Sequence, residues 1–189
     1  MLNKLALGTA QFGFNYGITN FQGQVQTSEV QSILSFAKSH GITTLDTAPG
    51  YGKSEQVLGE IGINGFQVIT KTEPLTSGVN KVIQAFIKSI DSLEVECVEG
   101  LLIRAKDIKD KDIDALYSEL YKLKQDKLIN KIGFSAYSPE QVDSLLINFD
   151  FDLIQVPLNI FDVRLAGGGQ LNALKDKDVE IHARSIFLQ

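Results

Sequence analysis

The chain has 189 residues, of which 43% are hydrophobic and 22% charged, a composition typical of a folded globular protein. Its 18 lysines and arginines are outnumbered by 23 aspartates and glutamates, so the basic surface that a nucleic-acid-binding protein needs is not expected. A single cysteine, Cys97, excludes an intrachain disulfide and a cysteine-based zinc cluster. We therefore expect a cytoplasmic protein with no metal site and no nucleic-acid partner.

The sequence contains no recognisable targeting or membrane segment. The apolar stretch from Met1 to Gly8 is too short for a signal peptide, and no run approaches the roughly 18 apolar residues of a membrane span. With roughly 150 residues per domain as a guide, and with no linker along the chain, residues 1–189 are expected to form a single domain.

Short apolar runs alternate with segments of helical period along the whole chain. The first predicted helix carries Val30, Leu34 and Ala37 at helical spacing, with Ser28 as its capping residue and Gly41 after its end. A later helix is predicted to begin after Ser138, because proline and a capping-box pattern follow. The predicted strands are 5–8, 42–46, 67–71, 100–104, 131–135, 152–156 and 179–186.

Regular alternation of strands and helices, with almost no hairpin signal, predicts a parallel sheet. A doubly wound sheet usually has a Gly-rich turn after its first strand, but residues 7–13 lack the G-x-G-x-x-G spacing. A closed barrel is favoured because polar residues recur at the predicted strand ends, which in barrels form the active-site rim. These residues are Asp46, Lys71, Arg104, Ser135, Gln155 and Arg184.

The predicted fold is therefore a (β/α)8 TIM barrel of which about seven strands are present. A complete barrel typically has about 250 residues, so at least one strand-helix unit is expected to be missing from these 189 residues. An opened barrel exposes the edges of its first and last strands, which predicts self-association through that edge. Barrels commonly hold phosphate groups in the loops after strands seven and eight, so residues 1–189 alone are expected to bind a phosphate-bearing cofactor too weakly for measurable activity.

The segment Gly41-Ile42-Thr43-Thr44-Leu45-Asp46-Thr47-Ala48-Pro49-Gly50-Tyr51-Gly52-Lys53-Ser54-Glu55 resembles the signature of the aldo-keto reductases. Further similarity to that family lies in Leu7-Gly8-Thr9, Ile69-Thr70-Lys71, Lys131-Ile132-Gly133-Phe134-Ser135 and Ile154-Gln155. The resemblance extends over the whole chain. It implies a (β/α)8 barrel that binds NADPH without a Rossmann domain and reduces an aldehyde or ketone to an alcohol.

The resemblance also implies the roles of individual residues. The catalytic positions fall on Asp46, Tyr51 and Lys71, and on Arg104 where the family has histidine. The implied cofactor contacts are Thr9, Asp46, Ser135, Gln155 and Arg184. Two positions depart from the family pattern, because Ala136 replaces the usual asparagine and Arg184 stands where many members carry an aromatic ring on the nicotinamide.

The chemistry of these residues supports the same function. Carbonyl reduction needs a proton donor for the developing alkoxide, and a nearby cation such as Lys71 should lower the pKa of the Tyr51 phenol from about 10. Asp46 can compensate the lysine charge. Arg104 could polarise the carbonyl, bind a substrate carboxylate or phosphate, pair structurally with Asp107, or have ended the activity.

The sequence is also compatible with two other functions. The arginine at position 104 and the incomplete barrel would suit a non-catalytic relative that binds a nucleotide or a partner. A lysine at a barrel strand end is also the usual nucleophile of a Schiff-base aldolase, which would use Lys71. Pairing with Asp46 argues against the aldolase, because an ion-paired ammonium is a poor nucleophile.

Overall fold

The computed structural model describes residues 4–187, in which seven parallel strands form one sheet. Each strand pairs with the next one along the chain, in the order β1-β2-β3-β4-β5-β6-β7. This sequential order is that of a barrel, whereas a doubly wound sheet reverses its order at a switch point. The strands are β1 (Ala6–Gly8), β2 (Thr44–Asp46), β3 (Gln67–Lys71), β4 (Val98–Arg104), β5 (Ile129–Ser135), β6 (Leu153–Pro157) and β7 (Glu180–Arg184).

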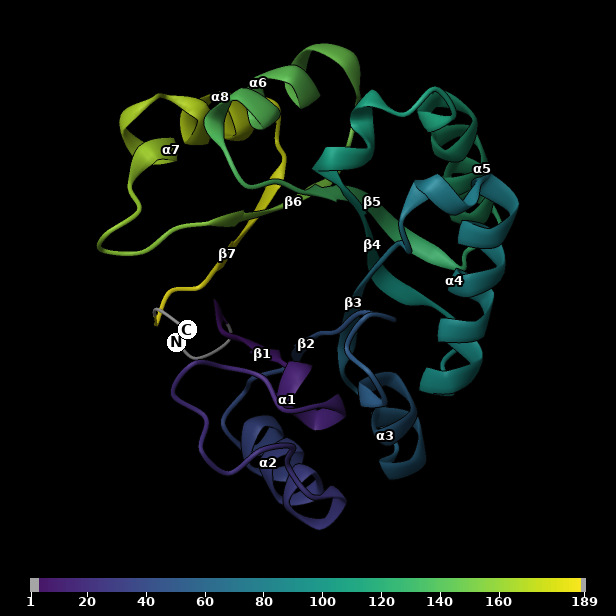
Figure 1. Ribbon diagram of the computed structural model, residues 1–189, viewed down its shortest axis with the longest axis vertical. Coiled ribbons are helices and arrows are strands. Elements are labelled where there is room, and N and C mark those ends of the chain that lie inside the picture. The colour runs from purple at the N-terminus through teal and green to yellow at the C-terminus, as the bar shows by residue number, and fades with distance from the viewer. Residues whose placement is uncertain (1–3, 188–189) are drawn as a thin grey trace.

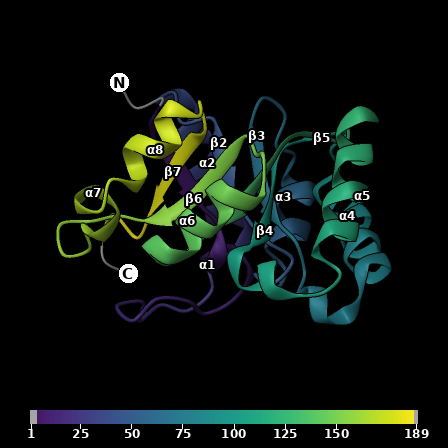
Figure 2. The same cartoon turned by 90° about the horizontal axis from the view of Figure 1, so that it is seen from above.

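The helices surround the curled sheet on its outside (Figures 1 and 2). Their bounds are α1 (Ala10–Gly13), α2 (Thr27–Ser39), α3 (Ser54–Ile61), α4 (Val79–Leu93), α5 (Ile113–Gln125), α6 (Pro139–Asn148), α7 (Arg164–Gly167) and α8 (Gln170–Asp176). Two 3₁₀ segments, η2 (Leu75–Ser77) and η3 (Ala105–Lys109), follow β3 and β4. The short elements α1, α7, η2 and η3 were not predicted, because one helical turn leaves no hydrophobic period in the sequence.

The predicted incomplete barrel is confirmed. Within residues 4–187, β1 and β7 have no hydrogen-bonded pairing with each other, so the sheet is curled but open between them (Figure 1). None of the helices in these residues has the length and apolar character needed to cross a membrane.

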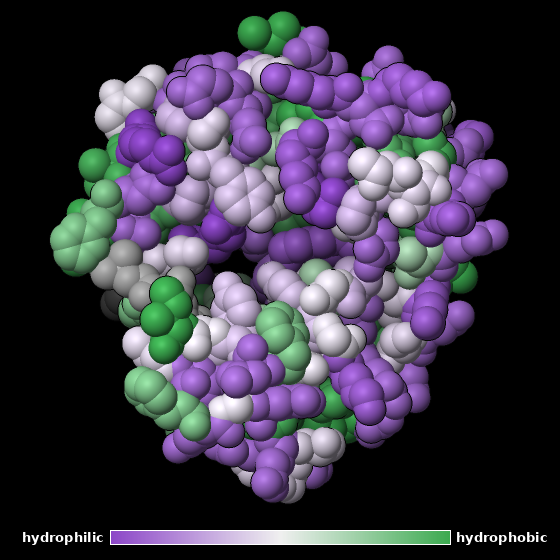
Figure 3. Space-filling model, viewed as in Figure 1, coloured by the Kyte–Doolittle hydropathy of each residue, from purple (hydrophilic) through white to green (hydrophobic). Residues whose placement is uncertain are grey.

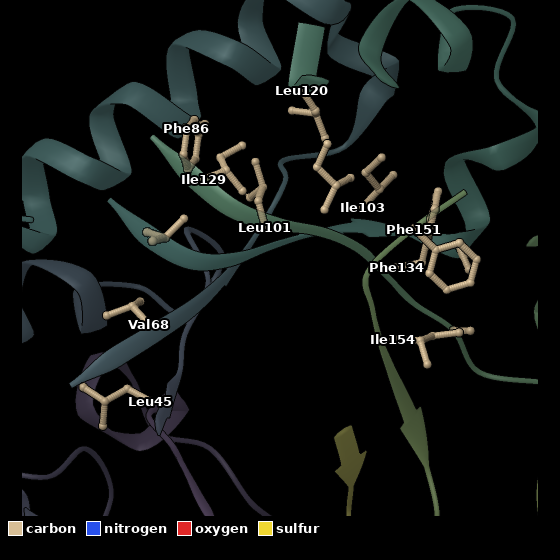
Figure 4. Close-up of a cluster of buried hydrophobic side chains, with 14 of the residues drawn as sticks. Leu45, Val68, Phe86, Leu101, Ile103, Leu120, Ile129, Phe134, Phe151 and Ile154 are labelled. Atoms are coloured by element: carbon tan, nitrogen blue, oxygen red, sulfur yellow. The ribbon is translucent and has the colours of Figure 1, made fainter. Parts of the chain in front are cut away.

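The main core lies between the sheet and the helices, where Leu45, Leu101, Phe134 and Ile154 point outward from their strands (Figure 4). A smaller cluster fills the barrel interior and consists of Ile69, Leu102 and Leu153, all nearly fully buried. Because side chains alternate along a strand, the residue two positions after an interior residue also faces the interior. Lys71, Arg104 and Gln155 occupy those positions, directly above this apolar cluster.

The two predicted helix starts had different outcomes. Ser138 caps α6 as predicted: its hydroxyl accepts a hydrogen bond from the Gln141 amide, and Pro139 is the first helical residue. The prediction that Ser28 caps α2 is wrong, because the helix already begins at Thr27 and the capping position is Gln26, which makes no side-chain cap. Gly41 follows this helix with φ of 77°, a left-handed conformation that suits glycine.

Candidate active site

A cavity of about 660 Å³ opens at the carboxyl ends of the strands. Figure 3 shows it as a hollow with largely hydrophilic walls. All eight predicted site residues border the cavity: Thr9, Asp46, Tyr51, Lys71, Arg104, Ser135, Gln155 and Arg184. Residues from the ends of β1 to β7 thus converge on one opening, as the strand-end pattern predicts.

Lys71 and Asp46 form the ion pair that was predicted. The Nζ atom of Lys71 donates to Asp46 Oδ1 at 2.8 Å, to Asp46 Oδ2 at 2.9 Å and to the carbonyl oxygen of Thr47 at 2.9 Å. These three contacts match the three protons of an ammonium group. Burial disfavours the charged lysine, but Asp46 and Tyr51 outweigh it and raise the pKa of Lys71. The amine is therefore held protonated.

The phenol of Tyr51 lies beside this ion pair. The Nζ atom of Lys71 is 5.0 Å from the centroid of the tyrosine ring. Lys71 lowers the pKa of Tyr51 as expected, but burial is the largest influence and Asp46 adds to it, so the pKa is raised overall. The expectation of a net lowering is therefore wrong. A desolvated phenol stays protonated at neutral pH, which is the form that can donate a proton.

Arg104 forms an ion pair with Asp107. This is the structural pairing that the sequence suggested as one of the possible roles of Arg104. Arg104 Nε donates to Asp107 Oδ2 at 3.0 Å, and Nη2 donates to Asp107 Oδ1 at 3.0 Å. The carboxylate is buried and also accepts a weak hydrogen bond from the Leu75 amide at 3.4 Å. One edge of the guanidinium is thus fixed on η3, while Arg104 still borders the cavity.

Arg184 lies over the ring of Tyr137, with its Cζ atom 4.1 Å from the ring centroid. Sequence reasoning missed Tyr137, although this exposed aromatic residue follows Ser135 by only two positions and borders the same cavity. The Nη2 atom of Arg184 donates to the Ala136 carbonyl at 3.4 Å. Its Nε atom is buried and has no hydrogen-bond partner among the described residues.

Thr9 borders the cavity but is fully buried. Its hydroxyl donates to the Asp46 carbonyl oxygen at 2.9 Å, so the side chain supports the strand end that carries Asp46. Ser135 and Gln155 are also buried, at 3% and 6% exposure, and both border the cavity. Gln155 was expected as a cofactor contact, and the structure adds a hydrogen bond from its amide to Asp46.

The protein is thus a parallel (β/α) barrel, open between β1 and β7, with aspartate, lysine and tyrosine side chains around the carboxyl ends of its strands. The family model "Aldo/keto reductase family" matches residues 4–189, and the chain belongs to that family. The curated aldo-keto reductase YhdN of Bacillus subtilis is 26% identical over 178 residues, which cover 85% of this chain and 51% of the relative. A Mycobacterium aldo-keto reductase is 26% identical over 129 residues, covering 65% of this chain and 46% of that protein. The chain thus spans about half the length of these curated relatives.

Solved structures of the family share the fold. A Pseudomonas aeruginosa chain named as an aldo-keto reductase has a TM-score of 0.79 and 24% identity, covering 96% of this chain and 73% of its own. A glycerol dehydrogenase from Gluconobacter oxydans has a TM-score of 0.73 and 29% identity, with 95% of this chain and 58% of its own covered. An aldo-keto reductase of Bombyx mori in complex with NADP has a TM-score of 0.70 and 20% identity, covering 96% of this chain and 62% of its own.

Proposed function

We propose that the protein reduces an aldehyde or ketone to an alcohol with NADPH, and that Tyr51 donates the proton. The observation that carries this proposal is the convergence of Tyr51, Lys71 and Asp46 at one cavity, with the ammonium satisfied by Asp46 and Thr47. Such an arrangement keeps a protonated phenol beside a fixed positive charge. General acid catalysis needs a donor of this kind close to the carbonyl oxygen.

The size and lining of the cavity support binding of the nicotinamide end of the cofactor there. Its volume of about 660 Å³ is in the usual range for a small-ligand site. The buried Nε atom of Arg184 has no partner among the described residues and is available to a ligand group. Ser135, Gln155 and Arg184 would hold this end. When bound, NADPH supplies the hydride for the reduction. The NADP complex of the Bombyx mori aldo-keto reductase supports the choice of cofactor.

In the proposed mechanism each residue of this chain has a separate task. Tyr51 would donate its phenol proton to the oxygen of the substrate as negative charge develops there. The resulting phenolate is stabilised by the ammonium of Lys71, which Asp46 holds in place. Arg104 would direct the free edge of its guanidinium toward the substrate, since Asp107 occupies the other edge.

The Schiff-base alternative is disfavoured by the surroundings of Lys71. A nucleophilic amine must be deprotonated, but here the three ammonium contacts and the raised pKa of Lys71 favour the charged form. The non-catalytic alternative depends on Arg104, whose pairing with Asp107 is compatible with a purely structural arginine.

The test is a titration with NADPH, followed by absorbance at 340 nm with a panel of aldehydes and ketones, using the product of the whole gene. We expect substrate-dependent NADPH oxidation that is lost in Tyr51→Phe. Cofactor binding without turnover of any carbonyl would favour the non-catalytic relative. Absence of NADPH binding in a folded protein would reject the proposal.

A further inference from the structure

Three hydroxyl side chains lie behind the site, where the proposed mechanism does not use them. Thr9 follows β1, Thr47 follows β2, and Ser54 is the first residue of α3. All three are fully buried. Buried hydroxyl groups are costly unless they are hydrogen-bonded, so their partners show what they hold in place.

Each hydroxyl has a single proton, and this fixes the direction of the network. Thr9 Oγ1 donates to the carbonyl oxygen of Asp46 at 2.9 Å. Ser54 Oγ then donates to Thr9, with Oγ1 at 2.8 Å and the carbonyl oxygen at 2.9 Å. Thr47 Oγ1 lies 3.3 Å from Ser54 Oγ. Because the Ser54 proton is already donated to Thr9, Thr47 is the donor in this contact. The network therefore runs from Thr47 through Ser54 and Thr9 to the backbone of Asp46.

This network closes the loop that carries Tyr51. The loop comprises residues 47–54, and the hydroxyl contact between Thr47 and Ser54 joins its two ends. Within it, the Tyr51 amide donates to the Ala48 carbonyl at 2.9 Å, and the Ser54 amide donates to the Tyr51 carbonyl at 3.1 Å. Ser54 therefore contacts the Tyr51 backbone through its amide and Thr9 through its hydroxyl, and Thr9 connects it to the backbone of Asp46.

Gly13, the last residue of α1, packs against the same loop. A Cβ atom added to Gly13 would lie 1.6 Å from the carbonyl oxygen of Tyr51 and 2.5 Å from the amide nitrogen of Ser54. Both neighbours are backbone atoms, so a side chain at this position must displace the loop. The close approach leaves the Tyr51 backbone little freedom to move.

We propose that Ser54, assisted by Gly13, is a positioning residue that holds the Tyr51 loop against the Asp46–Lys71 pair. The catalytic part of this inference rests on the proposed function, but the placement of the loop does not. A positioning error of about 1 Å can cost about 100-fold in rate, so a residue that touches no substrate can still control turnover.

The test compares Ser54→Ala with Ser89→Ala, which also removes a buried serine hydroxyl on α4. The Ser89 hydroxyl faces the side chain of Glu55 and not the Thr47–Ser54–Thr9 network, so Ser89→Ala leaves that network intact. Amide hydrogen exchange of residues 47–54 and ultraviolet titration of the phenols are measured in both. Subtraction of Tyr51→Phe spectra assigns the Tyr51 signal. We expect about 10- to 100-fold faster exchange in the loop, and a Tyr51 titration shifted toward that of a solvated phenol, only in Ser54→Ala.

Turnover is the second readout, with kcat expected to fall about 10- to 100-fold in Ser54→Ala while the Kd for NADPH changes less than twofold. If Ser54→Ala does not fold, Thr47→Val removes the neighbouring hydroxyl at equal volume, and Thr47→Ser should restore the Tyr51 titration. Unchanged exchange and titration in folded variants would overturn the inference. If the wild type has no reductase activity, the proposed function fails, whereas exchange and titration still decide the placement of the loop.

Discussion

Gln155 and Asp46, separated by 109 positions in the chain, are joined by a hydrogen bond of 2.6 Å from the Gln155 Nε2 atom to Asp46 Oδ2. The bond spans the barrel interior from β6 to β2. The nitrogen must face the carboxylate, because the amide oxygen has no proton to donate. Asp46 is therefore held by Lys71 from one side and by Gln155 from another, and Gln155 keeps its amide oxygen for another donor.

Gln155→Glu should place a second carboxylate against Asp46. Because two carboxylates at this separation cannot both ionise without a large cost, we expect a loss of about 2 to 4 kcal/mol in the free energy of unfolding at pH 7. The loss should shrink below pH 4 as the pair takes up a proton. Urea denaturation at both pH values measures it. Gln155→Met is the control, with a loss of about 1 kcal/mol that does not vary with pH.

Lys71 should form no covalent adduct with carbonyl compounds. Its ammonium contacts Asp46 twice and the Thr47 carbonyl once, and its raised pKa keeps it protonated. The protein is incubated with aldehydes and borohydride and then analysed by mass spectrometry with peptide mapping. A stable adduct on Lys71 would support the aldolase alternative against the reductase.

Tyr51→Phe should lower kcat by about two to four orders of magnitude, the usual scale of general acid catalysis. Binding of NADPH should change little, because the ring remains and only the hydroxyl is lost. The matched control is Tyr137→Phe, which keeps the ring under Arg184 and should retain most of the turnover. Equal effects of the two variants would remove Tyr51 from the proposed mechanism.

Arg104→Met should destabilise the protein, because the buried carboxylate of Asp107 loses both of its charge-assisted hydrogen bonds. We expect a loss of about 1 to 3 kcal/mol at pH 7, since a buried polar group is left without its partner. Adding Asp107→Asn should recover part of this loss, and a double-mutant cycle by urea denaturation gives the coupling between the two residues. Additive effects would mean that the pair contributes nothing to folding.

Arg104→His gives the functional counterpart of this experiment. If arginine hinders reduction, histidine should raise the rate with simple aldehydes, and if arginine anchors an anionic substrate, the rate with aldehydes carrying a carboxylate should fall. An unchanged rate with both classes would assign Arg104 a structural role.

Glu55→Gln should stabilise the protein at neutral pH. Glu55 is 7% exposed and accepts a hydrogen bond of 2.7 Å from Thr70, and burial raises its pKa. A carboxyl group with a raised pKa in the folded state contributes stability below its unfolded pKa of about 4.3 and loses it as the pH rises through the folded value. The gain from glutamine should therefore be present at pH 7 and vanish below pH 4, as measured by denaturant midpoints. A gain of the same size at both pH values would contradict this explanation.

The sequence by itself determined the order of the strands and longer helices, because hydrophobic periods and turn residues are local signals. β3 was predicted with its observed bounds, and the cap of α6 by Ser138 was predicted from adjacent residues. The segment 41–55 also indicated Asp46 and Tyr51 through its resemblance to the family signature, since both residues lie within that segment. These features depend on residues that are close along the chain.

The sequence predicted the pairing of Lys71 with Asp46, but only the tertiary structure decided the other polar contacts of the site. The hydrogen bond of Gln155 to Asp46, the stacking of Arg184 on Tyr137 and the burial of Thr9 each require the curled sheet to bring distant strand ends together. The raised pKa of Tyr51 likewise could not be inferred, because desolvation depends on the complete shape of the cavity. Local patterns thus fixed the elements, while long-range packing fixed the electrostatics of the site.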